Sequence, residues 1–204
     1  MSTSDTAPSS DEDPGRLDRS PLLMSRRDTG LLLVDVQEKL IPLIPGHKRL
    51  VWNIGRLLDA AALLGVPAAG TEQYPKGLGP LVPALRSRLA QIPDKTAFSC
   101  AACRPLFAEG PFAGLEKVLI CGIETHVCVQ QTVLDLLGLG LAVYVAADAV
   151  GSRYAIDHET ALRRMDSSGA VLTTTEAAIF ELCETAAAPE FKKLSQLIRQ
   201  PAPE

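Results

Sequence analysis

Residues 117–147 read KVLICGIETHVCVQQTVLDLLGLGLAVYVAA. The segments at either end, 117–121 and 141–147, are short apolar runs of the kind that form strands buried on both faces of a sheet. Between them, residues 128–137 repeat apolar side chains at helical spacing. A strand, a helix and a second strand in this order predict a βαβ unit with two parallel strands.

The same alternation continues on both sides of this unit. We expect further strands at residues 30–36, 66–71, 92–98 and 170–172, the third of them irregular because it contains Pro93. We expect helices at residues 47–64, 81–89, 157–165, 177–182 and 189–198. About six strands alternating with helices predict an α/β fold, a three-layer α/β/α domain whose mostly parallel sheet is covered on both faces.

Three helix starts have a residue pattern of their own. Asp157 is expected to cap the helix that follows it. Thr173 and Glu176 have the spacing of a capping box, and Pro189 suits the first turn of the last helix.

Length and composition limit the function. The chain has 204 residues, 47% of them hydrophobic, and a formal net charge of −4, which predicts one globular domain and argues against nucleic acid as a partner. No run of about 18 apolar residues is present, so we expect no membrane span. Residues 1–28 are rich in Ser, Asp and Pro and are expected to form a disordered tail ahead of a folded domain at 29–200.

The N-terminal segment also lacks the apolar core of a signal peptide. We therefore expect a cytoplasmic protein whose five cysteines are reduced thiols.

Polar residues at the carboxyl ends of strands are the first candidates for a site, because ligands of open parallel sheets bind at that edge. Asp35 follows a very apolar strand, where partial desolvation suits a carboxylate to proton transfer. Lys95 could stabilise a developing negative charge or lower the pKa of a thiol. The structural alternatives are a strand-end Asp that only caps the following turn and a solvated lysine paired with Asp94.

Cys128 is the strongest single candidate. It follows the loop GIETHV and opens a predicted helix, where the helix dipole favours an ionised, nucleophilic thiol. Neighbouring loop amides could donate to an oxyanion. The alternative is a buried structural cysteine, the usual fate of cysteine in apolar surroundings.

Cys100 and Cys103 form a C-x-x-C pair. No second pair accompanies them, so a four-ligand zinc site is not supported. A redox pair stays open, although we interpret the spacing as incidental. His126 lies two residues before Cys128 and is expected to line a pocket rather than to act on the thiol.

Four segments in order, LLLVDVQ, TEQYPKGLG, DKTAFS and VLICGIETHVCVQQTVLDLLGLGLAVYVAADAVGSR, make the chain resemble the isochorismatase-like cysteine hydrolases. The resemblance spans about residues 29–180 and is nearest to the branch of isochorismatase-domain proteins without an assigned substrate. It implies a six-stranded parallel sheet of Rossmann-like topology with helices on both sides, and a homo-oligomer.

The resemblance also implies a catalytic triad of Asp35, Lys95 and Cys128. Oxyanion donors would be the backbone amides of Glu124 and Cys128, and a cis peptide bond would join Ile123 to Glu124. Five side chains are expected to line the pocket: Gln37, Tyr74, Phe98, His126 and Val127.

The chain departs from the nicotinamidase-like members, which have an Asp and two His as metal ligands after the second strand. Gln73, Tyr74 and Pro75 occupy the matching positions here, so we expect no metal and no cofactor. Because Cys128 is present, we expect an acyl-transfer enzyme that hydrolyses a small amide or related acyl compound through a thioester. The alternatives are a non-catalytic binding protein that retains the fold, and a redox protein that uses Cys100 and Cys103.

Overall fold

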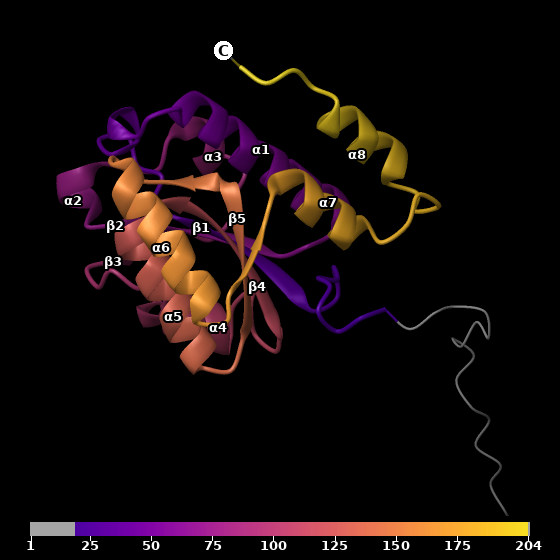
Figure 1. Ribbon diagram of the computed structural model, residues 1–204, viewed down its shortest axis with the longest axis horizontal. Coiled ribbons are helices and arrows are strands. Elements are labelled where there is room, and N and C mark those ends of the chain that lie inside the picture. The colour runs from indigo at the N-terminus through magenta and orange to yellow at the C-terminus, as the bar shows by residue number, and fades with distance from the viewer. Residues whose placement is uncertain (1–18, 204) are drawn as a thin grey trace, which may run out of the picture.

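The computed structural model describes residues 19–203, which form a three-layer α/β/α domain around one sheet (Figure 1). The six strands pair only in parallel, in the order β3-β2-β1-β4-β5-β6. Their bounds are β1 Thr29–Val34, β2 Ala68–Gln73, β3 Asp94–Lys95, β4 Lys117–Ile123, β5 Ala142–Gly151 and β6 Val171–Thr173. The predicted fold class is confirmed.

Eight α-helices and three shorter helical turns connect the strands of the described part of the chain. The α-helices are α1 His47–Leu64, α2 Pro75–Leu78, α3 Pro83–Arg86, α4 Arg104–Ala108, α5 Gln130–Gly138, α6 Ala155–Ser167, α7 Thr175–Cys183 and α8 Phe191–Ile198. The turns are η1 Ile41–Leu43, η2 Cys100–Ala102 and the π-helical turn η3 Thr125–Val129. Among residues 19–203, no helix has the length and apolarity to cross a membrane.

The helices cover the two faces of the sheet in separate groups. Helices α1, α3, α7 and α8 pack on one face, and α4, α5 and α6 pack on the other. Strand β1 alternates between the two cores, with Leu31 and Leu33 in the first and Leu32 and Val34 in the second. This double burial explains why the strand sequence is apolar throughout.

The strand order reverses between β1 and β4, which lie side by side in the middle of the sheet. Gly122 of β4 pairs with Val34 of β1, and a Cβ at Gly122 would collide with the backbone of Val34. Its φ of 134° is also one that side chains rarely adopt. A glycine is therefore required where the two central strands approach each other, directly below the carboxyl edge of the sheet.

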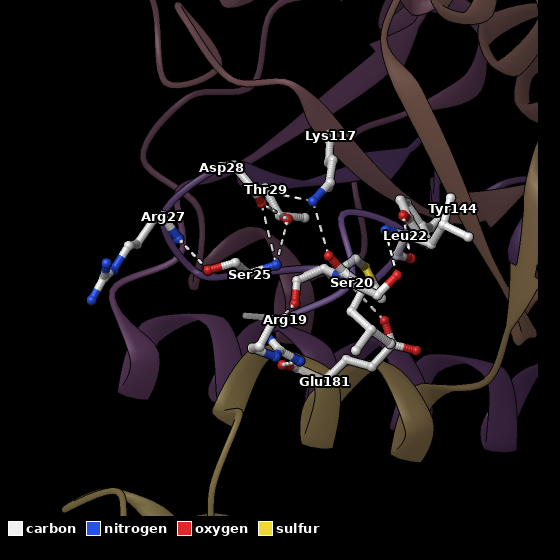
Figure 2. A network of polar contacts seen from close by, with 12 residues as sticks. Arg19, Ser20, Leu22, Ser25, Arg27, Asp28, Thr29, Lys117, Tyr144 and Glu181 are labelled. Carbon is white, nitrogen blue, oxygen red and sulfur yellow. Dashed lines mark hydrogen bonds and ion pairs between the residues drawn. The ribbon is translucent and has the colours of Figure 1, made fainter. Parts of the chain in front are cut away.

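Residues 19–28, which were predicted to belong to the disordered tail, are ordered and attached to the domain (Figure 2). Lys117 Nζ donates to the carbonyl of Leu23 at 2.9 Å and to Asp28 Oδ2 at 2.8 Å, and Tyr144 Oη donates to the carbonyl of Leu22 at 2.7 Å. Met24 is fully buried in the core. The prediction is wrong for this segment, because distant residues order it; residues 1–18 lie outside the described part of the chain.

Three expected helix starts are displaced. Helix α6 is preceded by Tyr154 rather than capped by Asp157, and α8 begins two residues after Pro189. Helix α7 is capped by the side chain of Thr174, which accepts from the amide of Ala177, and not by Thr173. Each start differs from its expected position by no more than two residues, which is the usual uncertainty of a helix boundary.

Candidate active site

Asp35, Lys95 and Cys128 lie together at the carboxyl edge of the sheet. Asp35 directly follows β1, Lys95 ends the edge strand β3, and Cys128 lies in the turn η3 after β4. Lys95 Nζ is 2.6 Å from Asp35 Oδ2, and the Cys128 thiol lies close enough to the Asp35 carboxylate for its charge to raise the pKa of the thiol. The structure thus brings the three residues together.

All three side chains are shielded from solvent. The exposed fraction is 1% for the Asp35 side chain, 2% for that of Lys95 and 7% for residue Cys128. Asp35 adopts a left-handed backbone conformation with φ of 53°, which Asp tolerates better than most residues. The chain therefore turns sharply at the end of β1, at the residue whose carboxylate meets Cys128 and Lys95.

The Lys95 ammonium is fully engaged. Besides Asp35, it donates to Gln73 Oε1 at 2.8 Å and to the carbonyl of Phe98 at 2.9 Å. An ammonium group has three protons to donate, and all three have acceptors here. Burial alone lowers the pKa of Lys95, but its electrostatic interactions with Cys100, Asp35 and Cys128 outweigh burial and raise its pKa, so it remains a cation.

The surroundings of Cys128 raise the pKa of its thiol, contrary to the expectation from a helix N-terminus. Burial raises its pKa, the nearby Asp35 carboxylate raises it further, and Lys95 offsets only part of this increase. Nor does Cys128 open a helix: it is the fourth residue of the π-helical turn, and α5 begins at Gln130. Burial and the Asp35 carboxylate therefore oppose the lowering of the thiol pKa that a helix N-terminus would give.

The bond between Ile123 and Glu124 is trans, since the structure contains no cis peptide bond among residues 19–203. The expected cis bond is therefore wrong for this structure. Glu124 instead continues from β4 in an extended conformation, with φ of −63° and ψ of 119°, and its carbonyl accepts from the amides of Val127 and Val129.

The five predicted pocket residues divide into two groups. Tyr74 and Phe98 are about half exposed, and Tyr74 lines a cavity of ≈ 480 Å³ together with Lys95, while His126 and Val127 are partly buried beside Cys128. Gln37, by contrast, is fully buried: its amide nitrogen donates to the carbonyls of Gln73 and Gly79, and its oxygen accepts from the amide of Gln73. It supports the strand that holds Gln73 and does not line a pocket.

The side chains of Glu124 and His126 contact the end of β5. Arg153 Nε donates to Glu124 Oε1 at 2.8 Å, and His126 Nδ1 lies 3.1 Å from Ser152 Oγ. His126 is thus held by Ser152, in agreement with the view that it does not form a dyad with Cys128.

Several residues of the site were missed in the sequence. Gln73 accepts from Lys95, Thr71 Oγ1 donates to Asp35 Oδ1 at 2.8 Å, and Thr132 Oγ1 donates to the carbonyl of Cys128 at 2.7 Å. Thr71 and Gln73 lie at the carboxyl end of β2, so the rule used for Asp35 could have found them. Thr132, four residues after Cys128 in a helical segment, has only its spacing to indicate a role.

Cys100, which we interpreted as incidental, also belongs to these surroundings. It is fully buried, and its Sγ lies 3.3 Å from Thr71 Oγ1. Cys103 is buried nearby, and all five cysteines are free thiols. Within the described residues, no group of three or more His, Cys, Asp and Glu side chains could hold a metal ion.

Comparison with known proteins gives consistent results. The family model described as isochorismatase domain matches residues 29–177. Isochorismatase domain-containing protein 2A of Mus musculus is 43% identical over 174 residues, which cover 85% of this chain and 84% of that protein.

Two solved structures have the same fold. The MAR1 ribonuclease of Caenorhabditis elegans superimposes with a TM-score of 0.83 at 40% identity, covering 89% of this chain and 95% of that one. An octameric hydrolase of unknown specificity from Escherichia coli superimposes with a TM-score of 0.80 at 26% identity, covering 89% and 91% of the two chains.

Proposed function

Because the chain belongs to the isochorismatase family, whose hydrolase fold it shares, we propose that it is a cysteine hydrolase acting on a small amide or related acyl compound. The observation that supports this most directly is the buried ion pair of Asp35 and Lys95, with the Cys128 thiol close enough to Asp35 for the carboxylate to raise the pKa of the thiol. A nucleophile within reach of a base that a third group orients is the arrangement that covalent catalysis requires.

The proposed first half-reaction begins with the neutral thiol. Asp35 takes the Cys128 proton as the sulfur attacks the carbonyl carbon, and the amides of Glu124 and Cys128 donate to the oxyanion that forms. When the tetrahedral intermediate collapses, the C–N bond breaks and the protonated Asp35 gives its proton to the leaving amine. A thioester on Cys128 remains.

The second half-reaction regenerates the enzyme. Asp35 takes a proton from a water molecule that attacks the thioester, the C–S bond breaks, and the proton returns to the sulfur while the carboxylic acid leaves. In the proposed resting state the thiol is neutral and the charges of Asp35 and Lys95 balance each other. The buried site therefore carries no net charge, which its shielding from water favours.

We assign Lys95 an electrostatic role rather than that of a direct oxyanion donor. Its three protons are used by Asp35, Gln73 and Phe98, so a bond to the oxyanion would leave one of these acceptors unpaired. Its charge orients Asp35 and stabilises negative charge that develops on the sulfur and the substrate.

Oligomer and compartment follow as further parts of the proposal. The octameric Escherichia coli relative supports a homo-oligomer, and the five free thiols suit the reducing cytoplasm. The partner is a small-molecule substrate, because the site is deeply buried.

The test is to incubate the protein with a panel of small amides and activated esters and to measure intact mass. We expect an acyl adduct on Cys128 and loss of turnover by about 10³-fold or more in Cys128→Ala. Cys121→Ala, which removes another buried thiol, is the matched control and should retain activity. Full turnover by Cys128→Ala, or adducts only on other cysteines, would reject the mechanism. Since one relative is described as a ribonuclease, RNA should be included in the panel.

A further inference from the structure

Cys100 is linked through two threonines to Asp35 and Cys128, the proposed base and nucleophile. The side chain of Cys100 makes the first link: its Sγ lies 3.3 Å from Thr71 Oγ1, and Thr71 Oγ1 donates to Asp35 Oδ1 at 2.8 Å. The backbone of Cys100 makes the second link: its amide donates to Thr132 Oγ1 at 2.9 Å, and Thr132 Oγ1 donates to the carbonyl of Cys128 at 2.7 Å. The base and the nucleophile are thus both linked to one residue.

The direction of the first link follows from counting protons. A threonine hydroxyl has one proton, and that of Thr71 is directed to the Asp35 carboxylate, which as an anion can only accept. The Cys100 thiol must therefore be the donor in its contact with Thr71. Burial, together with the charge of Asp35, raises the pKa of Cys100 to about 12, so the thiol keeps this proton over the whole neutral range.

Burial keeps these hydrogen bonds in a fixed arrangement. Thr71, Cys100 and Thr132 are all fully buried. A buried donor or acceptor that loses its partner has no water to replace it, so each of these bonds resists rearrangement. Asp35 is consequently fixed through both oxygens, by Thr71 on Oδ1 and by Lys95 on Oδ2.

We propose that Cys100 is a positioning residue that holds Asp35 through Thr71 and the Cys128 turn through Thr132. This inference rests on the proposed function but differs from it, because Cys100 itself forms no bond to substrate. It also assigns the cysteine of the C-x-x-C pair a role that needs neither a metal nor a disulfide.

The experiment is single-turnover acylation of Cys128 by 4-nitrophenyl acetate, followed by release of 4-nitrophenolate, in the full chain. Thr71→Val, which removes the hydroxyl and preserves the shape, should lower the acylation rate constant at least about tenfold, as should Cys100→Ala. Thr71→Ser and Cys100→Ser retain a donor and should recover most of the rate. The acylation rate constant at saturating ester should fall, whereas the affinity for the ester should stay unchanged. The reason is that Thr71 and Cys100 act on the position of Asp35 and not on binding of the ester.

A double-mutant cycle tests whether the two residues act in series. Thr71→Val combined with Cys100→Ala should lose no more than the larger single loss, because one link is already broken. Losses that multiply, or a Cys100→Ser variant as slow as Cys100→Ala, would overturn the proposal. Cys121→Ala is the control for removal of a buried thiol, and thermal unfolding of every variant separates slow acylation from a damaged fold.

A second measurement keeps the two proposals distinguishable. If the wild-type chain is never acylated at Cys128, the proposed function fails, whereas the links can still be examined by crystallography of Thr71→Val, Thr71→Ser and Thr132→Val. A displaced Asp35 carboxylate in Thr71→Val but not Thr71→Ser, and a shifted Cys128 turn in Thr132→Val, would support the positioning role. Unchanged positions in all three variants would reject it.

Discussion

At the scale of single residues, the Asp35 carboxylate is the centre of the site. It accepts from Thr71 and Lys95, and its charge also acts on the Cys128 thiol. Its negative charge adds to burial in raising the pKa of Cys128, so the proposed base also favours the protonated form of the proposed nucleophile.

The first prediction separates thiol reactivity from catalysis. Asp35→Asn removes the negative charge that raises the pKa of Cys128 and leaves the Lys95 cation in place, so the pKa of the thiol should fall. We expect alkylation of Cys128 by iodoacetamide at pH 8 to become about tenfold faster or more, since each pKa unit changes the thiolate fraction tenfold. Hydrolysis should nevertheless be lost, because the base is gone.

Alkylation is measured by mass spectrometry of the Cys128 peptide over time. In the wild-type chain the rate should keep rising with pH beyond 8, as expected for a thiol whose pKa is raised. An Asp35→Asn variant that is alkylated at the wild-type rate or more slowly would contradict this account.

The second prediction concerns the cost of leaving Asp35 without its partner. Lys95→Met should lower the free energy of unfolding by about 3–5 kcal/mol, because it leaves a buried carboxylate unpaired. The double variant Asp35→Asn/Lys95→Met should be more stable than Lys95→Met alone, since it removes both charges. Urea denaturation measures both values, with the exposed Lys192→Met as the control, which should change stability by less than about 0.5 kcal/mol.

At the scale of helices and strands, local patterns predicted some elements fully and others only in part. The helix His47–Leu64 was predicted with its observed bounds, because it is long, amphipathic and followed by Gly65 in a left-handed conformation. Strand β5 instead continues to Gly151, where Val150 and Gly151 pair with Gly122 and Ile123 after a shift in register. That extension depends on a neighbouring strand, so no local pattern could reveal it.

The candidate site was likewise predicted only in part from the sequence. Asp35, Lys95 and Cys128 were found by their positions after strands and by the resemblance, and the structure brings them together. The raised pKa of the thiol could not be predicted, because it depends on burial by residues distant in the sequence. The π-helical turn could not be predicted either, because Thr125–Val129 has no residue pattern that distinguishes it from an ordinary first helical turn.

The third prediction tests the close approach of β1 and β4. Gly122→Ala should cost about 3 kcal/mol or more of stability and disturb the turn after β4, because the added Cβ meets the Val34 backbone and φ is 134°. Gly138→Ala, at the end of α5 with nothing within 4 Å of the added Cβ, is the control and should be neutral or stabilising by up to about 1 kcal/mol. Chemical denaturation distinguishes the two, and equal stabilities would contradict the packing argument.

At the scale of the whole molecule, the sheet is linked to the N-terminal segment at the edge opposite the site. Lys117 begins β4 and binds Asp28 and Leu23, while Arg19 Nη2 donates to the carbonyl of Glu181 in α7. Residues 19–28 therefore connect the central strands with the helical layer of α7. Their composition resembles that of a tail, and only these long-range contacts order them.

The fourth prediction follows from the ion pair at this edge. Burial raises the pKa of Asp28, but hydrogen bonds from Lys117, Thr29 and Ser25 outweigh it and lower the pKa below the ordinary value. The pair should therefore stabilise the fold above about pH 4 and lose its effect as the pH falls through the lowered pKa. Asp28→Asn should cost about 1 kcal/mol at pH 7, measured by urea denaturation. The difference from wild type should shrink at pH 3, and a constant difference would contradict the assignment.

The fifth prediction uses the same segment. A chain that begins at residue 29 should unfold at a temperature several degrees lower than one that begins at residue 19, because it lacks Met24 and the bonds to Lys117 and Tyr144. Differential scanning calorimetry of the two chains measures this difference. Equal melting temperatures would show that the segment contributes nothing to the fold.

The raised pKa of the Cys128 thiol has a consequence for the protein in an oxidising cell. Peroxides react with thiolates far faster than with thiols, so a sulfur that keeps its proton is a poor target for them. In the proposed mechanism, the burial and the carboxylate that keep Cys128 protonated therefore also protect its sulfur from oxidation to sulfenic acid.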